Sequence, residues 1–157
     1  AVLCCGDVGL GAWQWGWQYN ALGWLFETIV YGQRGCGRSD TPSGPYSMKD
    51  LVTDLKTVMV EANVRQAHLV GCGLGGCVAL AAARHTNRAQ SLTLIGTSAS
   101  GDAFEPSALR ADPADTAALR ESTTTLLSTP FCEDHPEVVD QIVDWRANED
   151  GTPTAQQ

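Results

Sequence analysis

Apolar residues in this chain form short continuous runs that alternate with longer segments of helical spacing. The short runs have the length of buried strands and lie at residues 2–5, 27–31, 67–71 and 91–95. Apolar residues recur three and four positions apart over residues 48–62 and 74–84, and more weakly between residues 13 and 25. Strands that alternate with helices favour a mostly parallel sheet with right-handed crossovers. We therefore predict an α/β fold with about four strands and flanking helices.

The clearest helix start lies at Ser47. A serine that precedes an apolar helical pattern is a favourable N-cap, and Asp50 stands three residues later, in the place of the acidic partner of a capping box. This pairing predicts that the helix begins at about Met48.

The composition changes after residue 100. Ala, Asp, Thr and Pro become frequent, and no strand pattern follows residue 96. Helical stretches are predicted at residues 107–109, 115–127 and 137–148. We expect residues 1–100 to form the α/β core and residues 101–157 to form a small helical segment that is incomplete.

The charge balance excludes two classes of partner. Ten Lys and Arg residues stand against 18 Asp and Glu residues, which gives a net charge of −8. A negative surface repels a nucleic-acid backbone and an anionic membrane. No apolar run approaches the roughly 20 residues that span a bilayer. We expect a soluble protein that binds neither nucleic acid nor membrane.

The basic residues are mostly arginine, because only Lys49 and Lys56 are lysines. An acidic chain with few lysines resembles proteins from high-salt cytoplasm, where the screening length falls to about 3 Å near 1 M salt and a negative surface no longer destabilises the fold. An ordinary acidic protein is the alternative.

Six cysteines raise the question of disulfides or metal. Four of them lie in apolar, strand-like or helix-like segments, which is typical of small buried side chains in a reducing cytoplasm rather than of a disulfide framework. Cys4 and Cys5 are adjacent and Cys72 and Cys77 are five apart, so the spacing of a zinc site is missing. We expect a cytoplasmic protein with no metal and no cofactor.

Residues 68–76 carry the most information about function. A buried strand runs into a glycine-dense turn and then into an apolar helix, with Gly71 and Gly75 framing the turn. This segment resembles the nucleophile elbow of the α/β-hydrolase superfamily, in which a G-x-S-x-G turn lifts the nucleophile above the sheet. Gly73 occupies the nucleophile position in this chain.

Other segments support the same resemblance. The first strand and its loop match the family's strand-His-Gly-x-x-Gly segment, with Cys5 where the histidine usually stands. Residues 33–40 match its R-G-x-G-x-S loop, and residues 91–98 match the strand after the elbow. These segments follow the family order across about residues 1–100. The resemblance implies relatives that cleave small apolar esters, lactones or amides, and it identifies residues 101–157 as the start of a helical cap.

The catalytic groups of serine hydrolysis are absent from this segment. The mechanism needs a nucleophile, a histidine and a carboxylate that orients the histidine. Gly73 has no side chain, and in the family the carboxylate and the histidine follow later strands. The three histidines, His68, His85 and His135, match no catalytic position, and the strand period turns Cys72 away from the site. We expect no serine-hydrolase activity in this chain.

An anion-binding site made by backbone N–H groups is the part of the machinery that remains possible. The resemblance assigns these groups to Asp7 and Leu74. However, the Asp7 carboxylate disfavours a second negative charge nearby. The alternative is that the glycines at 6, 9 and 11 merely permit a tight loop, and the sequence leaves both interpretations open.

Four further residues are candidates for lining a pocket. Cys5 and Cys72 are neighbours in the expected fold, either as a redox-linked pair or, more simply, as two small side chains that pack together. Trp13 lies in an alternating tryptophan segment that suits a pocket or, more commonly, a core. Trp145 lies in the predicted cap, above the expected cavity.

Three functions remain open. The first is the front part of a hydrolase-fold protein without serine chemistry, which another chain can complete as one half of a split hydrolase. The second is a non-catalytic binding protein for a small apolar ester or lactone. The third is an incomplete product that keeps the fold without activity. A four-stranded sheet has two edges that natural proteins usually cover. We therefore expect a second chain, or a second copy, to be able to complete the sheet.

Overall fold

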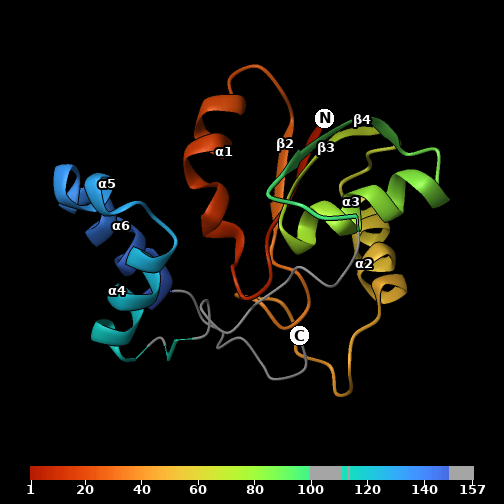
Figure 1. Cartoon of the computed structure of the whole chain (residues 1–157). Helices are drawn as coiled ribbons and strands as arrows, with labels where there is room; N and C mark the ends of the chain where they lie inside the picture. Colours follow the sequence, from red (N-terminus) through yellow and green to blue (C-terminus); the bar gives the residue numbers. More distant parts are fainter. Residues whose placement is uncertain (100–110, 113, 149–157) are drawn as a thin grey trace.

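The computed structural model describes residues 1–99, 111–112 and 114–148. Its centre is a parallel four-stranded sheet with the strand order β2-β1-β3-β4 (Figure 1). The strands are β1 (Val2–Cys5), β2 (Thr28–Tyr31), β3 (Ala67–Cys72) and β4 (Ala89–Ile95). The predicted α/β class and parallel sheet are confirmed.

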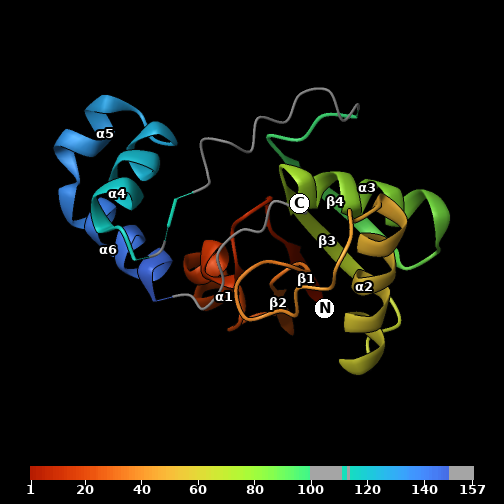
Figure 2. The same ribbon diagram turned by 90° about the horizontal axis from the view of Figure 1, so that it is seen from below.

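Helices cover the two faces of the sheet unequally. On one side lie α2 (Met48–Glu61) and α3 (Leu74–His85). On the other side lie the short 3-10 helix η1 (Ala12–Trp15) and α1 (Gly16–Leu22), as Figures 1 and 2 show. Parallel sheets are normally buried on both faces. Here η1 and α1 cover the second face over β1 and β2. At the edge strand β4, Leu94 and Ile95, which point to opposite faces, are 42% and 47% exposed.

The start of α2 follows the sequence pattern. The Ser47 hydroxyl accepts a hydrogen bond from the Asp50 N–H at 3.3 Å, and the Asp50 carboxylate accepts one from the Ser47 N–H at 2.9 Å. These two bonds complete the capping box and satisfy backbone donors that a helix start would otherwise leave open.

The core on the α2–α3 side is the larger one. Leu3, Leu55, Met59 and Leu69 have no exposed surface there. A smaller cluster on the α1 side joins Val2, Cys4 and Trp15. None of the helices in the part of the chain that the structure describes has the length and hydropathy needed to cross a bilayer.

Three helices follow the sheet and pack around a core of their own, which consists of Leu119, Val139 and Val143. They are α4 (Thr116–Thr125), α5 (Thr129–Asp134) and α6 (Pro136–Ala147). The stretches predicted at 115–127 and 137–148 correspond to α4 and α6. The sequence pattern missed α5, which has six residues, whereas the stretch predicted at 107–109 lies outside the described residues.

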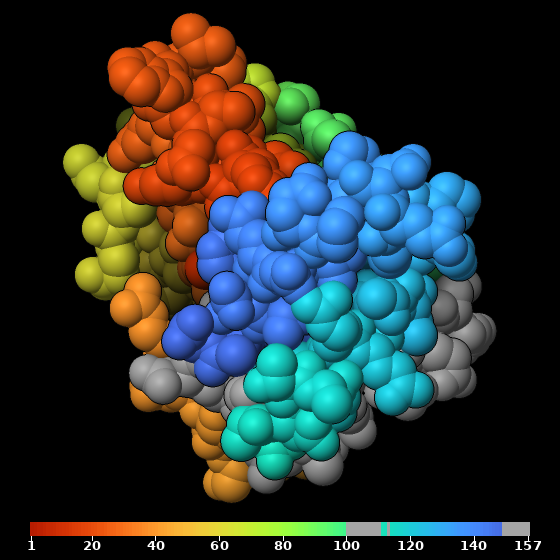
Figure 3. All heavy atoms as spheres, turned by 90° about the vertical axis from the view of Figure 1, so that its left-hand side faces the viewer, coloured from red at the N-terminus to blue at the C-terminus, as the bar shows by residue number. Residues whose placement is uncertain are grey.

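Helix α6 contacts the N-terminal part of the chain through Trp145. Its ring lies 4.8 Å from the Trp17 ring and 6.5 Å from the Trp13 ring, centroid to centroid. A Cβ atom placed on Gly16 would lie 3.3 Å from the Trp145 ring, so the absence of a side chain there permits the close approach. Figure 3 shows the residues of α6 lying against those of η1 and α1.

Candidate functional site

The turn between β3 and α3 has the geometry of a strained elbow. Gly73 lies between the two elements with φ +53° and ψ −120°, a conformation that side chains rarely adopt. Helix α3 crosses close to β1, and a Cβ atom on Gly75 would overlap the backbone oxygens of Cys5 and Gly6. Glycine at these positions therefore holds the elbow against the neighbouring loop.

The Asp7 carboxylate fills the space above this elbow. Its Oδ1 atom accepts hydrogen bonds from the backbone N–H of Val8 at 2.7 Å and of Leu74 at 2.8 Å. A Cβ atom on Gly73 would overlap this carboxylate. Because Leu74 is the first residue of α3, the negative charge also lies at the positive end of the helix dipole.

Both backbone donors that the resemblance assigned to an oxyanion hole are occupied. The Leu74 N–H donates to Asp7, and the Asp7 N–H donates to Oε1 of Gln14 at 2.9 Å. A developing oxyanion needs such donors to be preorganised and open. In this structure the Asp7 carboxylate, rather than a substrate oxyanion, accepts the hydrogen bond from the Leu74 N–H.

Cys5 and Cys72 do not form the packed pair that the sequence suggested. Cys5 is fully buried on the α2–α3 side, where the Tyr31 hydroxyl donates to its Sγ at 3.8 Å. Cys72 packs with Cys4 and Trp15 on the opposite face. Burial raises the pKa of Cys5 to about 12. Burial, with the Asp7 charge as a second cause, also raises the pKa of Cys72. All six cysteines are free, and neither of these two has thiolate character near neutral pH.

Trp13 and Trp145 are brought together, but to one side of the elbow. They line a cavity of about 580 Å³ between the end of β2 and α6, together with Val30, Tyr31, Arg38, Ser39 and Asn148 among others. Neither Gly73 nor Asp7 lines this cavity.

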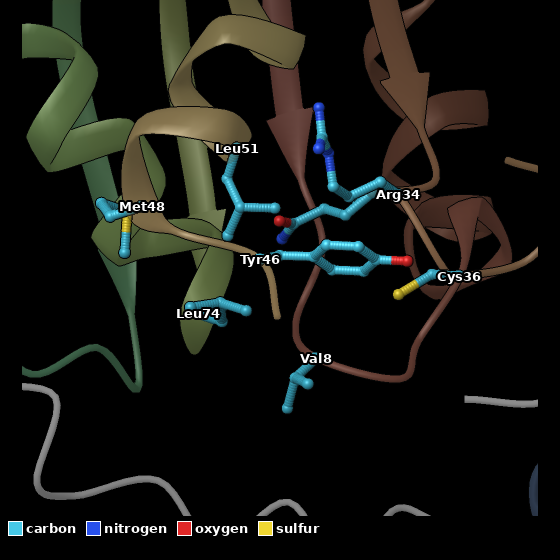
Figure 4. Close-up of a pocket in the computed structure, with 8 residues that line it drawn as sticks. Val8, Arg34, Cys36, Tyr46, Met48, Leu51 and Leu74 are labelled. Atoms are coloured by element: carbon cyan, nitrogen blue, oxygen red, sulfur yellow. The ribbon is translucent and has the colours of Figure 1, made fainter. Parts of the chain in front are cut away.

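A second cavity, of about 110 Å³, lies directly beside the elbow (Figure 4). Val8 and Leu74, whose N–H groups hold Asp7, contribute side chains to its wall. Its other lining residues are Gln33, Arg34, Cys36, Tyr46, Met48 and Leu51. None of these eight residues stood out in the sequence as part of a pocket wall, although Gln33 and Arg34 follow a strand end in a polar loop, where ligand-binding residues are common.

One polar side chain of this cavity is almost completely buried. Gln33 is 3% exposed, and its Nε2 donates to the backbone oxygen of Gly6 at 2.5 Å. Its Oε1 has no hydrogen-bond partner among the described residues.

Arg34, in contrast, is held in place by its neighbours. Its guanidinium donates to both carboxylate oxygens of Asp54 at 2.5 and 2.6 Å and lies 5.5 Å from the centre of the Tyr46 ring. The hydrogen bonds to Asp54 raise the pKa of Arg34.

The histidines lie away from the elbow. His68 stands at the start of β3, with Nδ1 2.8 Å from the Ser91 hydroxyl, and His85 ends α3. His135 caps α6, 3.5 Å from a carboxylate oxygen of Glu137. Within the described ranges, no group of three His, Cys, Asp or Glu side chains is arranged to hold a metal ion.

Comparisons with known proteins agree with this architecture. A family model described as the alpha/beta hydrolase fold matches residues 9–143. RutD of Azorhizobium caulinodans, whose name describes it as a candidate carbamate hydrolase, is 33% identical over 104 residues, which are 66% of this chain and 39% of that protein. 3-oxoadipate enol-lactonase 2 of Acinetobacter baylyi is 25% identical over 147 residues, which are 90% of this chain and 55% of that protein.

Solved structures resemble the fold across nearly the whole chain. The enol-lactonase from Burkholderia xenovorans has a TM-score of 0.74 and 27% identity, and the match covers 95% of this chain and 59% of that one. A hydrolase from Pseudomonas aeruginosa has a TM-score of 0.74 and 26% identity, with 99% and 61% covered. The chain thus spans about two fifths of the length of RutD and about three fifths of these solved chains.

Proposed function

The chain belongs to the α/β hydrolase family, and within that family we propose that it binds a small carbonyl compound without forming an acyl-enzyme at residue 73. The observation that carries this proposal is the position of the Asp7 carboxylate, which accepts from the Val8 and Leu74 N–H groups where a nucleophile and an oxyanion would have to lie. Serine-type acyl transfer requires a side-chain nucleophile and open N–H donors. Gly73 supplies no nucleophile. Of the two donors, the Leu74 N–H is taken by the Asp7 carboxylate and the Asp7 N–H is taken by Gln14.

The class of ligand is supported by the relatives. Two of them are named as enol-lactonases, and others as hydrolases. A small ester or lactone is therefore the ligand that we propose for this chain.

The cavity beside Trp13 and Trp145 is the site that we propose for this non-catalytic binding of an ester or lactone. Its volume of about 580 Å³ lies within the range of roughly 300–1,000 Å³ that is typical of small-ligand sites. In this interpretation helices α4, α5 and α6 act as a cap segment, from which Trp145 and Asn148 line the cavity.

The β4 edge of the sheet is where we propose that a partner joins. The exposed apolar residues Leu94 and Ile95 of β4 support an additional strand or chain that completes the sheet. Slow hydrogen exchange of the β4 amides only in the presence of that partner would support this arrangement. Rapid exchange in every preparation would contradict it.

The acidic composition supports a cytoplasmic protein adapted to high salt. The test compares the free energy of unfolding in about 0.1 M and 1 M KCl, where the screening length falls from about 10 Å to 3 Å. A halophilic chain gains stability with salt, whereas an unchanged or lower free energy of unfolding would favour an ordinary acidic protein.

The central test is chemical. The native chain is incubated with a fluorophosphonate that labels activated serines, and its hydrolysis of short-chain aryl esters is measured at high salt. We expect no labelled serine and no turnover above the buffer rate, whereas short esters and lactones shift the amide resonances of residues that line the cavity beside Trp13 and Trp145. Enzyme-like turnover, or one stoichiometrically labelled serine identified by mass spectrometry, would contradict the proposal.

A further inference from the structure

The unpaired oxygen of Gln33 is the least explained group near the elbow. The side chain belongs to a residue that is only 3% exposed, it lines the cavity of about 110 Å³, and its Oε1 has no partner among the described residues. Buried polar atoms without a hydrogen bond are uncommon in folded proteins, and each calls for an explanation such as a water or a ligand.

The orientation of this amide is fixed by its other contact. Carbonyl oxygens can only accept hydrogen bonds, so the atom that approaches the Gly6 oxygen at 2.5 Å must be the amide nitrogen. Turning the amide over would place two acceptors against each other. The oxygen that remains is therefore an acceptor, and it needs a donor.

The rest of the cavity wall limits what this donor can belong to. Val8, Leu51, Leu74 and Met48 contribute apolar side chains. Arg34 is the cation in the wall, and both its Nε and its Nη2 donate to Asp54, so its charge is already balanced. An anionic ligand would have to enter this apolar cavity without a new positive partner, which is unfavourable.

The volume of the cavity limits the size of the ligand. About 110 Å³ is several times the roughly 15 Å³ that one water needs and less than the roughly 150 Å³ of a cavity known to take benzene. A molecule or terminal group of a few heavy atoms fits.

We propose that this cavity binds a small neutral ligand that carries an N–H or O–H donor, and that Gln33 Oε1 is the acceptor that selects it. A primary carboxamide is the simplest such ligand, because it joins a carbonyl group to a donor and carries no charge. This assignment rests on the proposed binding of a small carbonyl compound. It gives the elbow-side cavity a ligand class of its own, because the esters and lactones proposed for the cavity beside Trp13 and Trp145 carry no N–H or O–H donor. It makes Gln33 a specificity-determining residue.

Two probe molecules isolate the hydrogen bond. Acetamide and acetone have nearly the same size and shape and share a carbonyl group, but only acetamide has N–H donors. A site that is built to receive a donor rejects the analogue that lacks it, because the buried acceptor stays unpaired. We expect acetamide to bind about tenfold more tightly than acetone, the upper range for one neutral hydrogen bond.

The measurement is a titration of the ¹⁵N-labelled full chain, in which the backbone amides of Val8 and Leu74 and the side-chain amide of Gln33 are followed by NMR. In Gln33→Met the preference for acetamide should disappear. The matched control is Gln66→Met. The Gln66 side-chain amide also donates to a backbone oxygen, that of Asn87 at 2.8 Å, but Gln66 is exposed and does not line the cavity. Gln66→Met should keep the preference.

A second variant covers the case in which Gln33→Met does not fold. Met48 lines the cavity and is 38% exposed, so Met48→Trp fills the space from the surface. It should weaken the binding of both probes at least about tenfold, since the space that they need is occupied.

The outcomes separate the two proposals. Equal binding of acetamide and acetone by the native chain, or binding that Met48→Trp leaves unchanged, overturns the assignment of Gln33. So does an absence of shifts with either probe, which would leave water as the occupant of the cavity. A labelled catalytic serine together with a normal acetamide preference would overturn only the proposal of binding without acylation.

Discussion

The Asp7 carboxylate and the position of a side chain on residue 73 occupy the same space, so a glycine at 73 and an aspartate at 7 are structurally matched. A larger residue at 73 would have to displace the carboxylate that caps α3.

Gly73→Ser should lower the free energy of unfolding by at least about 2 kcal/mol, because backbone strain at positive φ adds to the collision with Asp7. The matched control is Gly96→Ser, since Gly96 has φ +56° but open space around a Cβ atom, and it should lose only about 1 kcal/mol. Urea unfolding of both variants, of Asp7→Gly, and of Gly73→Ser combined with Asp7→Gly gives the coupling between positions 7 and 73. A double variant as unstable as the sum of the two single changes would contradict the collision.

The buried thiols predict a loss of stability in alkali. The pKa of Cys5 is raised from 9.0 to about 12 and that of Cys4 from 9.0 to about 11, both by burial. Between these values the unfolded chain has released protons that the folded chain still holds, so stability is fully present below about pH 9 and falls as the pH rises toward 12. Urea midpoints between about pH 8 and pH 10.5 should therefore decrease.

The pH slope has its own control. Cys5→Ala removes one of the titrating thiols, so the urea midpoint of the variant should fall less steeply with pH than that of the native chain. This comparison of slopes does not depend on how much stability the substitution costs at pH 8. Tyr31, whose pKa burial also raises, leaves part of the slope in place. A native midpoint that does not change with pH over this range would refute the burial of these thiols.

The ion pair between Arg34 and Asp54 should contribute more than an exposed one. Its side chains are 23% and 28% exposed and form two hydrogen bonds. A double-mutant cycle with Arg34→Lys and Asp54→Asn should give a coupling of about 1 kcal/mol, since lysine cannot reproduce the bidentate contact. The same cycle at Arg120 and Asp140, which are 49% and 56% exposed, should give close to zero. Equal couplings would indicate that Arg34 is as well solvated as Arg120.

Trp145 should anchor the α4–α6 helices to α1. Trp145→Ala removes two ring contacts of about 0.5–1.5 kcal/mol each, so the free energy of unfolding should fall by about 1–3 kcal/mol. Trp24→Ala is the control, because Trp24 is 89% exposed, and it should change stability by less than about 0.5 kcal/mol. Equal losses in the two variants would show that Trp145 does not hold this contact.

The pattern of apolar residues was sufficient for the four strands, which are short continuous apolar runs, and for α2 and α3, which have helical spacing. Helix α2 also has a capping residue. Helix α5 escaped prediction because six residues with a proline at the second position carry too little periodicity. Strand β4 begins two residues before the predicted Ser91, where Ala89 pairs with Ala67 across an irregularity in the register.

The side-chain arrangement of the site depended on information that the sequence lacks. In the observed register, Cys4 lies beside Val70 and therefore shares a face with Cys72, whereas Cys5 lies beside Gly71 and faces the other way. A shift of one residue would have reversed this assignment. The sequence pointed to a conflict between Asp7 and an oxyanion, but the hydrogen bond from Leu74 spans 67 positions and emerges only from the folded chain.

The close crossing of α3 over β1 has a consequence for how such chains diverge. Residues 73 and 75 differ in which substitutions they tolerate. A side chain at residue 75 would push α3 off the backbone of Cys5 and Gly6, whereas a glycine at residue 73 leaves the packing of α3 on β1 intact. In this fold, the nucleophile at residue 73 can therefore be lost more readily than the glycine at residue 75, on which the packing of α3 against β1 depends. A side chain at residue 75 would therefore disturb the packing of α3 on β1, whereas one at residue 73 would meet the Asp7 carboxylate.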